Sequence, residues 1–179
     1  MALDPPVTRQ GEQVYYESEV IDQYRGHLYG LAVDLGTTTV VAELVDLETG
    51  RSLCRGGFEN PQRFGGSDVI SRVAYDAGHA GELHQSIINA LNTEIISMCQ
   101  QSGISRHTLY EIVVVGNSTM RDLFFGLDVQ SIGQRPYKST TEHETLAGTR
   151  TGTQLEAGAR ELGVIASPTG RVVSPPLVA

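Results

Sequence analysis

The sequence has few of the residues that mark metal, disulfide or nucleic-acid chemistry. Tryptophan is absent, and the two cysteines, Cys54 and Cys99, are far apart with no C-x-x-C pair. This excludes a cysteine-rich metal site or a disulfide scaffold and favours a reducing cytoplasm. Lysine and arginine total 13 against 21 acidic residues, a formal net charge of −8. Because nucleic acids and anionic membranes are held largely by clustered basic residues, we expect neither as a partner.

Long apolar runs and a leader pattern are also missing. No apolar run approaches ~18 residues, so we expect neither a secretory leader nor a membrane span. With 179 residues, 40% of them hydrophobic, the chain is long enough for one globular domain. Residues 1–26 are polar, carry Pro5-Pro6 and offer only 14–16 as a strand. We interpret 1–26 as a linker remnant or edge ribbon and place the domain at 27–179.

The most informative stretch is the turn between two apolar runs, 28–33 and 40–45. The turn contains Asp34, Gly36, Thr37, Thr38 and Thr39. Gly36 allows a ligand close to the main chain, so that successive amides and the threonine hydroxyls converge on phosphate oxygens. Asp34 can hold Mg²⁺ directly or through water. An ordinary hairpin turn with threonines of high strand propensity is the alternative.

The rest of the chain alternates helix and strand patterns. A third strand at 52–58 completes three antiparallel strands, and apolar residues at three- and four-residue spacing from 83 to 98 predict a long helix that ends at Gly103. The β-branched run 112–115 predicts a strand buried on both faces. We expect a loop excursion over 127–152, a helix over 153–162 capped by Thr153 and Glu156, and a last strand near 172–173.

A second polar turn follows the predicted strand 112–115. It comprises Gly116, Asn117, Ser118 and Thr119 and leads into a short apolar helix. Ligands gather at the carboxyl ends of strands in open α/β sheets, and helix N-termini offer free amides. We therefore predict a second phosphate-binding patch here. The alternative is that Asn117 or Ser118 only caps the helix.

This order of elements predicts an α/β ribonuclease H-like fold: a mixed sheet with three antiparallel strands, then parallel strands, flanked by helices. The turn 34–39 resembles the first phosphate motif of the actin, sugar-kinase and heat-shock ATPase superfamily. Three sequence segments are more specific to one family than this turn alone. They are residues 29–39, residues 60–72, which begin with Asn60-Pro61-Gln62, and residues 115–120. Together they resemble the ATPase domain of the reductive activators of corrinoid proteins.

The resemblance implies a function for a longer protein. It implies an ATP- and Mg²⁺-dependent activator that reduces the cobalt of a methyltransferase's corrinoid protein, with an iron-sulfur cluster in an N-terminal domain. This chain lacks the four cysteines for a cluster and lacks the second lobe of the nucleotide cleft. We therefore expect it to be the first lobe of the ATPase domain, inactive alone, with a corrinoid protein as partner and a homodimer as a further possibility.

Three alternatives stay open at this point. The chain could belong to a small-metabolite kinase, to an activator of another low-potential reductase, or to a non-catalytic docking or dimerisation lobe. Asp68 and Arg72 are four residues apart, and we interpret them as a solvated helix pair, although a role at the cleft is open. The five histidines lack metal-ligand spacing, and we expect His79 and His84 at the surface.

Overall fold

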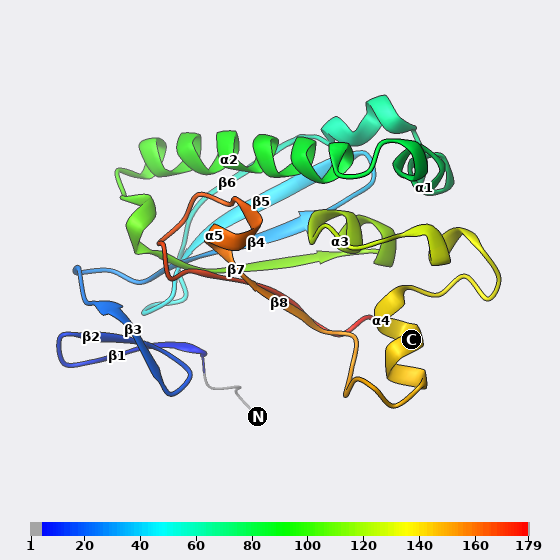
Figure 1. Ribbon diagram of the computed structural model, residues 1–179. Helices are drawn as coiled ribbons and strands as arrows, with labels where there is room; N and C mark the ends of the chain where they lie inside the picture. The colour runs from blue at the N-terminus through cyan, green and yellow to red at the C-terminus, as the bar shows by residue number, and fades with distance from the viewer. Residues whose placement is uncertain (1–4, 179) are drawn as a thin grey trace.

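The computed structural model describes residues 5–178 and centres on a six-stranded sheet (Figure 1). The strand order is β6-β5-β4-β7-β9-β8. The strands are β4 (Tyr29–Leu35), β5 (Thr39–Asp46), β6 (Ser52–Glu59), β7 (Leu109–Gly116), β8 (Leu155–Gly158) and β9 (Arg171–Ser174). β4, β5 and β6 pair antiparallel, and β7 and β9 then join parallel to β4. The predicted ribonuclease H-like, actin-like mixed sheet is confirmed.

One long helix, α2 (Glu82–Ser102), forms most of the layer over this sheet (Figure 1). Its predicted apolar stripe, from Leu83 to Met98, is buried, and Gly103 ends it in the left-handed conformation. The other helices are α1 (Val69–Gly78), α3 (Ser118–Phe124), α4 (Thr140–Leu146) and α5 (Ala159–Leu162), with 3₁₀ turns at Pro61–Gly65, Arg106–Thr108 and Gln130–Gly133. This layer covers the sheet face that carries Leu31, Val33 and Leu35.

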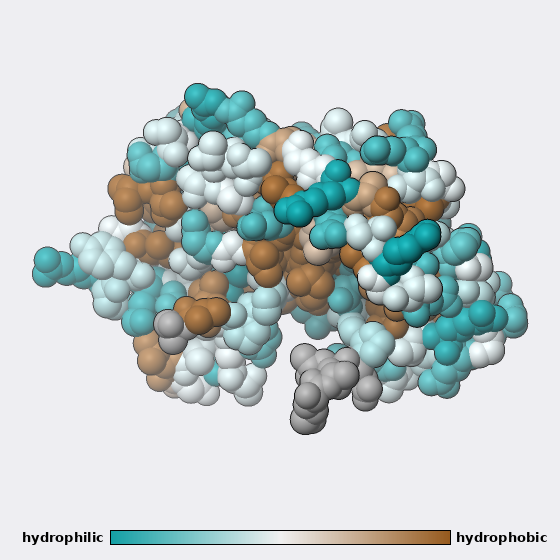
Figure 2. Space-filling model, turned by 180° about the vertical axis from the view of Figure 1, so that it is seen from behind, coloured by the Kyte–Doolittle hydropathy of each residue, from teal (hydrophilic) through white to brown (hydrophobic). Residues whose placement is uncertain are grey.

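The opposite face of the sheet is largely open. Asp34 is exposed, Val113 is half-buried and Val115 is 42% exposed, so the prediction that 112–115 is buried on both faces is wrong. A shallow groove of about 160 Å³ lies there, lined by side chains that include Asp34, Glu43 and Arg55. Seen from behind, the molecule has apolar side chains at its centre and a hollow beneath them (Figure 2).

The N-terminal segment is more ordered than a linker. Residues 1–4 of the expected linker lie outside the described residues, but β1 (Val7–Gln10), β2 (Gln13–Tyr16) and β3 (Glu19–Gln23) form a separate antiparallel sheet where one strand was expected. Its apolar side packs with Leu28 and Tyr110 in a second small core. The Tyr110 hydroxyl donates to Asp22 Oδ2 at 2.7 Å. This sheet is therefore docked on the start of β4 and β7.

The region after residue 127 also differs from the prediction. The expected loop excursion contains α4, whose capping box joins Ser139 and Glu142. The expected helix start at Thr153 is wrong, because 155–158 pairs with β9 as an edge strand and α5 begins only at Ala159. The predicted end of that helix at Leu162 is confirmed, and Gly163 follows it in the left-handed conformation. Strand pairing has overridden a local capping pattern here.

Candidate phosphate-binding site

The fold places the two predicted polar turns side by side. β4 and β7 are parallel neighbours, with Asp34 opposite Val115 and Leu35 opposite Gly116 in the register. The turn after β4 and the turn after β7 therefore leave the same edge of the sheet. This is the edge at which α/β sheets bind ligands.

The turn between β4 and β5 is held by its carbonyl groups. Asn60 Nδ2 donates to Gly36 O at 2.9 Å, and the Asn60 backbone amide donates to Thr38 O at 2.8 Å. Between them, Arg72 Nη2 donates to Thr37 O at 2.7 Å. Three successive carbonyls thus point toward the layer formed by the Pro61–Gly65 turn and α1.

The direction of the carbonyls fixes the direction of the amides. In a trans peptide, the N–H of each residue points opposite to the C=O of the residue before it. The amides of Thr37, Thr38 and Thr39 therefore point away from Asn60 and Arg72. Within residues 5–178, the amides of Thr37 and Thr38 donate no hydrogen bond to another protein group. This arrangement resembles an anion-binding nest.

Both glycines of the site are required by close approach. A Cβ on Gly36 would lie 2.3 Å from Thr39 O, and one on Gly116 would lie 2.9 Å from Leu35 O. Backbone atoms cannot move aside as flexible side chains can. The two turns thus need glycine because of packing between neighbouring strands and turn residues.

Arg72 and Asp68 do not form the solvated pair that the sequence indicated. Asp68 is the N-cap of α1 and its side chain accepts a hydrogen bond from the Ser71 amide at 2.9 Å. Arg72 is fully buried, and its Nε donates to Gly66 O at 2.9 Å. Burial lowers the pKa of its guanidinium, although Asp68 opposes this shift, and arginine stays protonated in proteins.

Asp34 lies on the open face of the sheet, one residue before the end of β4 and the start of the turn. Its neighbours Val33 and Leu35 face the core, so the alternation of the strand directs Asp34 the other way. Among residues 5–178, no group of three His, Cys, Asp or Glu side chains could hold a metal ion. One exposed carboxylate fits Mg²⁺, which keeps several waters and takes further ligands from phosphates.

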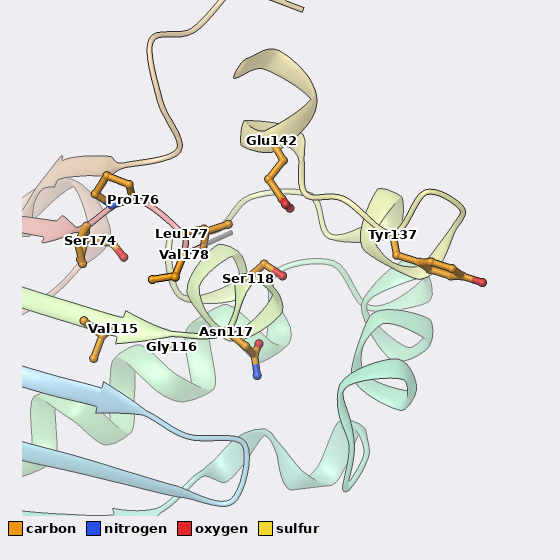
Figure 3. Close-up of a pocket in the computed structure, with 11 residues that line it drawn as sticks. Val115, Gly116, Asn117, Ser118, Tyr137, Glu142, Ser174, Pro176, Leu177 and Val178 are labelled. Carbon is orange, nitrogen blue, oxygen red and sulfur yellow. The ribbon is translucent and has the colours of Figure 1, made fainter. Parts of the chain in front are cut away.

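The turn after β7 opens a pocket of about 430 Å³ (Figure 3). Asn117 caps α3, since its Oδ1 accepts from the Met120 amide at 2.9 Å. This bond leaves the Asn117 amide nitrogen free, and Figure 3 shows it on the side of the β4–β5 turn. Ser118 lines the pocket, whereas Thr119 is 1% exposed and lies in the interior.

Comparisons with known proteins agree with this architecture. Residues 29–179 match the protein family described as the RACo middle region. The chain belongs to the RACo middle-region family. It is also 30% identical to a solved structure titled "Reductive activator for corrinoid, iron-sulfur protein", with a TM-score of 0.78 over 93% of this chain and 24% of that one.

A curated relative carries a similar name. The chain is 37% identical over 114 residues to the "Corrinoid activation enzyme RamQ" of Eubacterium limosum, which covers 62% of this chain and 19% of the relative. The relatives of this RACo middle region are thus corrinoid activators, and the chain spans about a quarter or less of their length. Among the residues described here, no helix has the length and apolarity needed to cross a membrane.

The residues that support the turn could not be recognised from the sequence pattern. Asn60, Gln62 and Arg72 are all fully buried, whereas the sequence indicated no such position for Asn60 and Gln62 and placed Arg72 in a solvated pair. A signal existed for Arg72, which lies three residues after Val69 and next to Val73 on the inner face of α1. Ile70, in contrast, is 62% exposed although its side chain is apolar. Of the histidines, His79 is exposed as expected, but His84 is half-buried and its Nδ1 lies 2.8 Å from Phe124 O.

Proposed function

We propose that this chain supplies the first phosphate-binding turn of an ATP-dependent activator. In that protein, ATP use drives reduction of the corrinoid cofactor of a methyltransferase system. The observation that carries the proposal is the row of outward amides at Thr37 to Thr39, fixed by Asn60 and Arg72. The relatives named as corrinoid activators support the choice of process.

The residues of the chain have distinct roles in this proposal. The amides and hydroxyls of the 36–39 turn hold phosphate oxygens, and Asp34 positions Mg²⁺. Asn117 Nδ2 and Ser118 are further donors from the neighbouring turn. Phosphoryl transfer depends mostly on placement and charge neutralisation, which these groups supply on one side of the nucleotide. Other parts of the intact protein complete the cleft and carry the iron-sulfur cluster, so the chain alone is inactive.

Replacing Asp34 with Asn in the intact protein tests this assignment. Because Asp34 is exposed, the variant keeps its thermal stability. We expect ATP hydrolysis and ATP-dependent corrinoid reduction to fall at least about tenfold, as for loss of a group that orients a metal ion. Both rates are measured at saturating Mg²⁺.

Glu43→Gln is the matched control. Glu43 lines the same open groove as Asp34 but lies further from the turn. The substitution removes the same single negative charge. The Gln variant should leave both rates within about twofold of wild type, because Glu43 pairs opposite Ala32, two residues further from the turn along β4 than Asp34. Unaltered hydrolysis and corrinoid reduction in Asp34→Asn would sink the assignment.

A further inference from the structure

Arg72 is a buried cation bonded only to neutral groups. Its guanidinium donates to Gly66 O, Thr37 O, Gln62 Oε1 at 3.5 Å and Met120 Sδ at 3.2 Å. Among residues 5–178, no carboxylate lies within salt-bridge distance of it. A buried charge without a counter-charge is costly to the fold. The packing of α1 would be satisfied by an uncharged side chain, so it does not by itself explain a charged residue at position 72.

The charge lies directly behind the turn. Arg72 Nη2 is 2.7 Å from Thr37 O, and the N–H on the other side of that peptide is the outward amide of Thr38. A charged donor on the carbonyl polarises the peptide and strengthens its N–H as a donor. The nearby carboxylate of Asp68 acts on Arg72 without an ion pair, and an anion bound in front of the turn would add a second negative charge.

The same side chain also reaches the second turn. Arg72 Nη1 contacts Met120 Sδ, and Asn60 Nδ2 contacts the same sulfur at 3.8 Å. The backbone amide of Met120 in turn donates a hydrogen bond to Asn117 Oδ1. Gln62 is fixed by its own bond to Leu83 O at 3.1 Å and presents Oε1 to Arg72. Arg72 thus connects the two predicted phosphate turns.

We infer that Arg72 is a positioning residue whose buried positive charge strengthens phosphate binding at the 36–39 turn. The inference rests on the proposed function and adds an electrostatic source to it. The amides contact the phosphate, and Arg72 acts through the Thr37–Thr38 peptide without touching it. Its charge, and not only its hydrogen bonds, sets the affinity.

Amide-resolved NMR titration of the 179-residue chain with inorganic pyrophosphate tests this inference. Wild type should show shifts at the Thr37 and Thr38 amides. Arg72→Gln should weaken the affinity about tenfold, the scale of one charge interaction at intermediate distance and dielectric. Arg72→Lys keeps the charge and should stay within about threefold of wild type.

Arg63→Gln is the control for loss of one positive charge. Arg63 lies in the adjacent 3₁₀ turn, but its side chain is 64% exposed and pairs with Glu59. The affinity of the Arg63→Gln variant for pyrophosphate should therefore differ from wild type by less than about twofold. Wild-type affinity in a folded Arg72→Gln, or a folded Arg72→Lys more than about tenfold weaker than wild type, would overturn the inference. If Arg72→Gln does not fold, the Lys variant decides alone. Absence of shifts at Thr37 and Thr38 in wild type would instead contradict the proposed function.

Discussion

At the scale of single residues, the 36–39 turn, which we propose binds phosphate, is held by hydrogen bonds that its backbone carbonyls accept from the buried side chains behind it. Gly36, Thr37 and Thr38 offer their carbonyls to Asn60 and Arg72, and their side chains contribute little to this. A residue that alters the path of the backbone should therefore affect binding more than loss of one threonine hydroxyl.

Gly36→Ala tests this dependence on the backbone. The added Cβ would meet Thr39 O at 2.3 Å, and the turn must shift to relieve the clash. We expect a loss of about 2 kcal/mol in the free energy of unfolding, as for overpacking, together with loss of pyrophosphate binding. Chemical denaturation and the amide titration measure the two effects.

Gly78→Ala provides the comparison. Gly78 is the last residue of α1, and a Cβ there would meet nothing within 4 Å. Alanine favours helix over glycine by up to about 1 kcal/mol, so this variant should be as stable as wild type or more so and bind normally. If Gly36→Ala had the same stability and pyrophosphate affinity as Gly78→Ala, the turn would not need the close backbone approach that glycine allows.

The positions and roles of the residues at the candidate site were only partly predictable from the sequence. The role of Gly36 follows from a glycine between two strands, and the position of Asp34 from strand alternation. The burial of Arg72 was not predicted, because its partners Gly66, Thr37 and Met120 come from three separate segments. Local spacing indicates which residues share a helix face but not what covers that face.

At the scale of elements, the N-terminal sheet is joined to the main sheet by a hydrogen bond that responds to pH. Tyr110 in β7 donates to Asp22 in β3. Burial alone would raise the pKa of Asp22. Hydrogen bonds from the Tyr110 hydroxyl and the Gln23 amide, together with the Arg25 guanidinium 3.3 Å away, outweigh burial and hold this pKa below its usual value. The ionised carboxylate is thus the form that the docked sheet favours.

Tyr110→Phe should lower the free energy of unfolding by about 1 kcal/mol near neutral pH, the value of one hydrogen bond. Because the pKa of Asp22 is lowered on folding, its contribution is full above the unfolded value. It is lost as pH falls through the lower folded value. The difference between wild type and variant should therefore shrink only below about pH 4.

Tyr15→Phe in β2 is the control for this prediction, since its hydroxyl bonds an exposed Gln13 at 3.2 Å. It should change stability by less than about 0.5 kcal/mol. Denaturant unfolding between about pH 3 and 7 measures all three proteins. A Tyr110→Phe effect that is zero at neutral pH, or that grows in acid, would contradict the docking role of Asp22.

Helices and strands with a strong periodic spacing of apolar residues were predicted well. Those with a weak apolar pattern were not. Helix α2 and strands β4 to β7 follow from apolar spacing and turn residues. The N-terminal sheet was missed because its strands of four or five residues are mostly polar and gain their apolar contact from Tyr110 and Leu28. Similarly, β8 exists because β9 offers an edge for pairing.

At the scale of the whole molecule, one face of the six-stranded sheet is covered by helices and the other is open beside the 36–39 turn. The order of strands and helices was predictable, since three antiparallel strands followed by alternating helix and strand are typical of ribonuclease H-like folds. The open face was not, because the run 112–115 is apolar throughout.

The central claim is that the amides of the 36–39 turn bind phosphate. A structure of the intact protein with a non-hydrolysable ATP analogue and Mg²⁺ tests it most directly. We predict phosphate oxygens at about 2.7–3.2 Å from the Thr37 and Thr38 nitrogens, with Asp34 on the metal or one of its waters. Phosphates bound elsewhere, with these two amides facing solvent or bonded to protein, would contradict the claim.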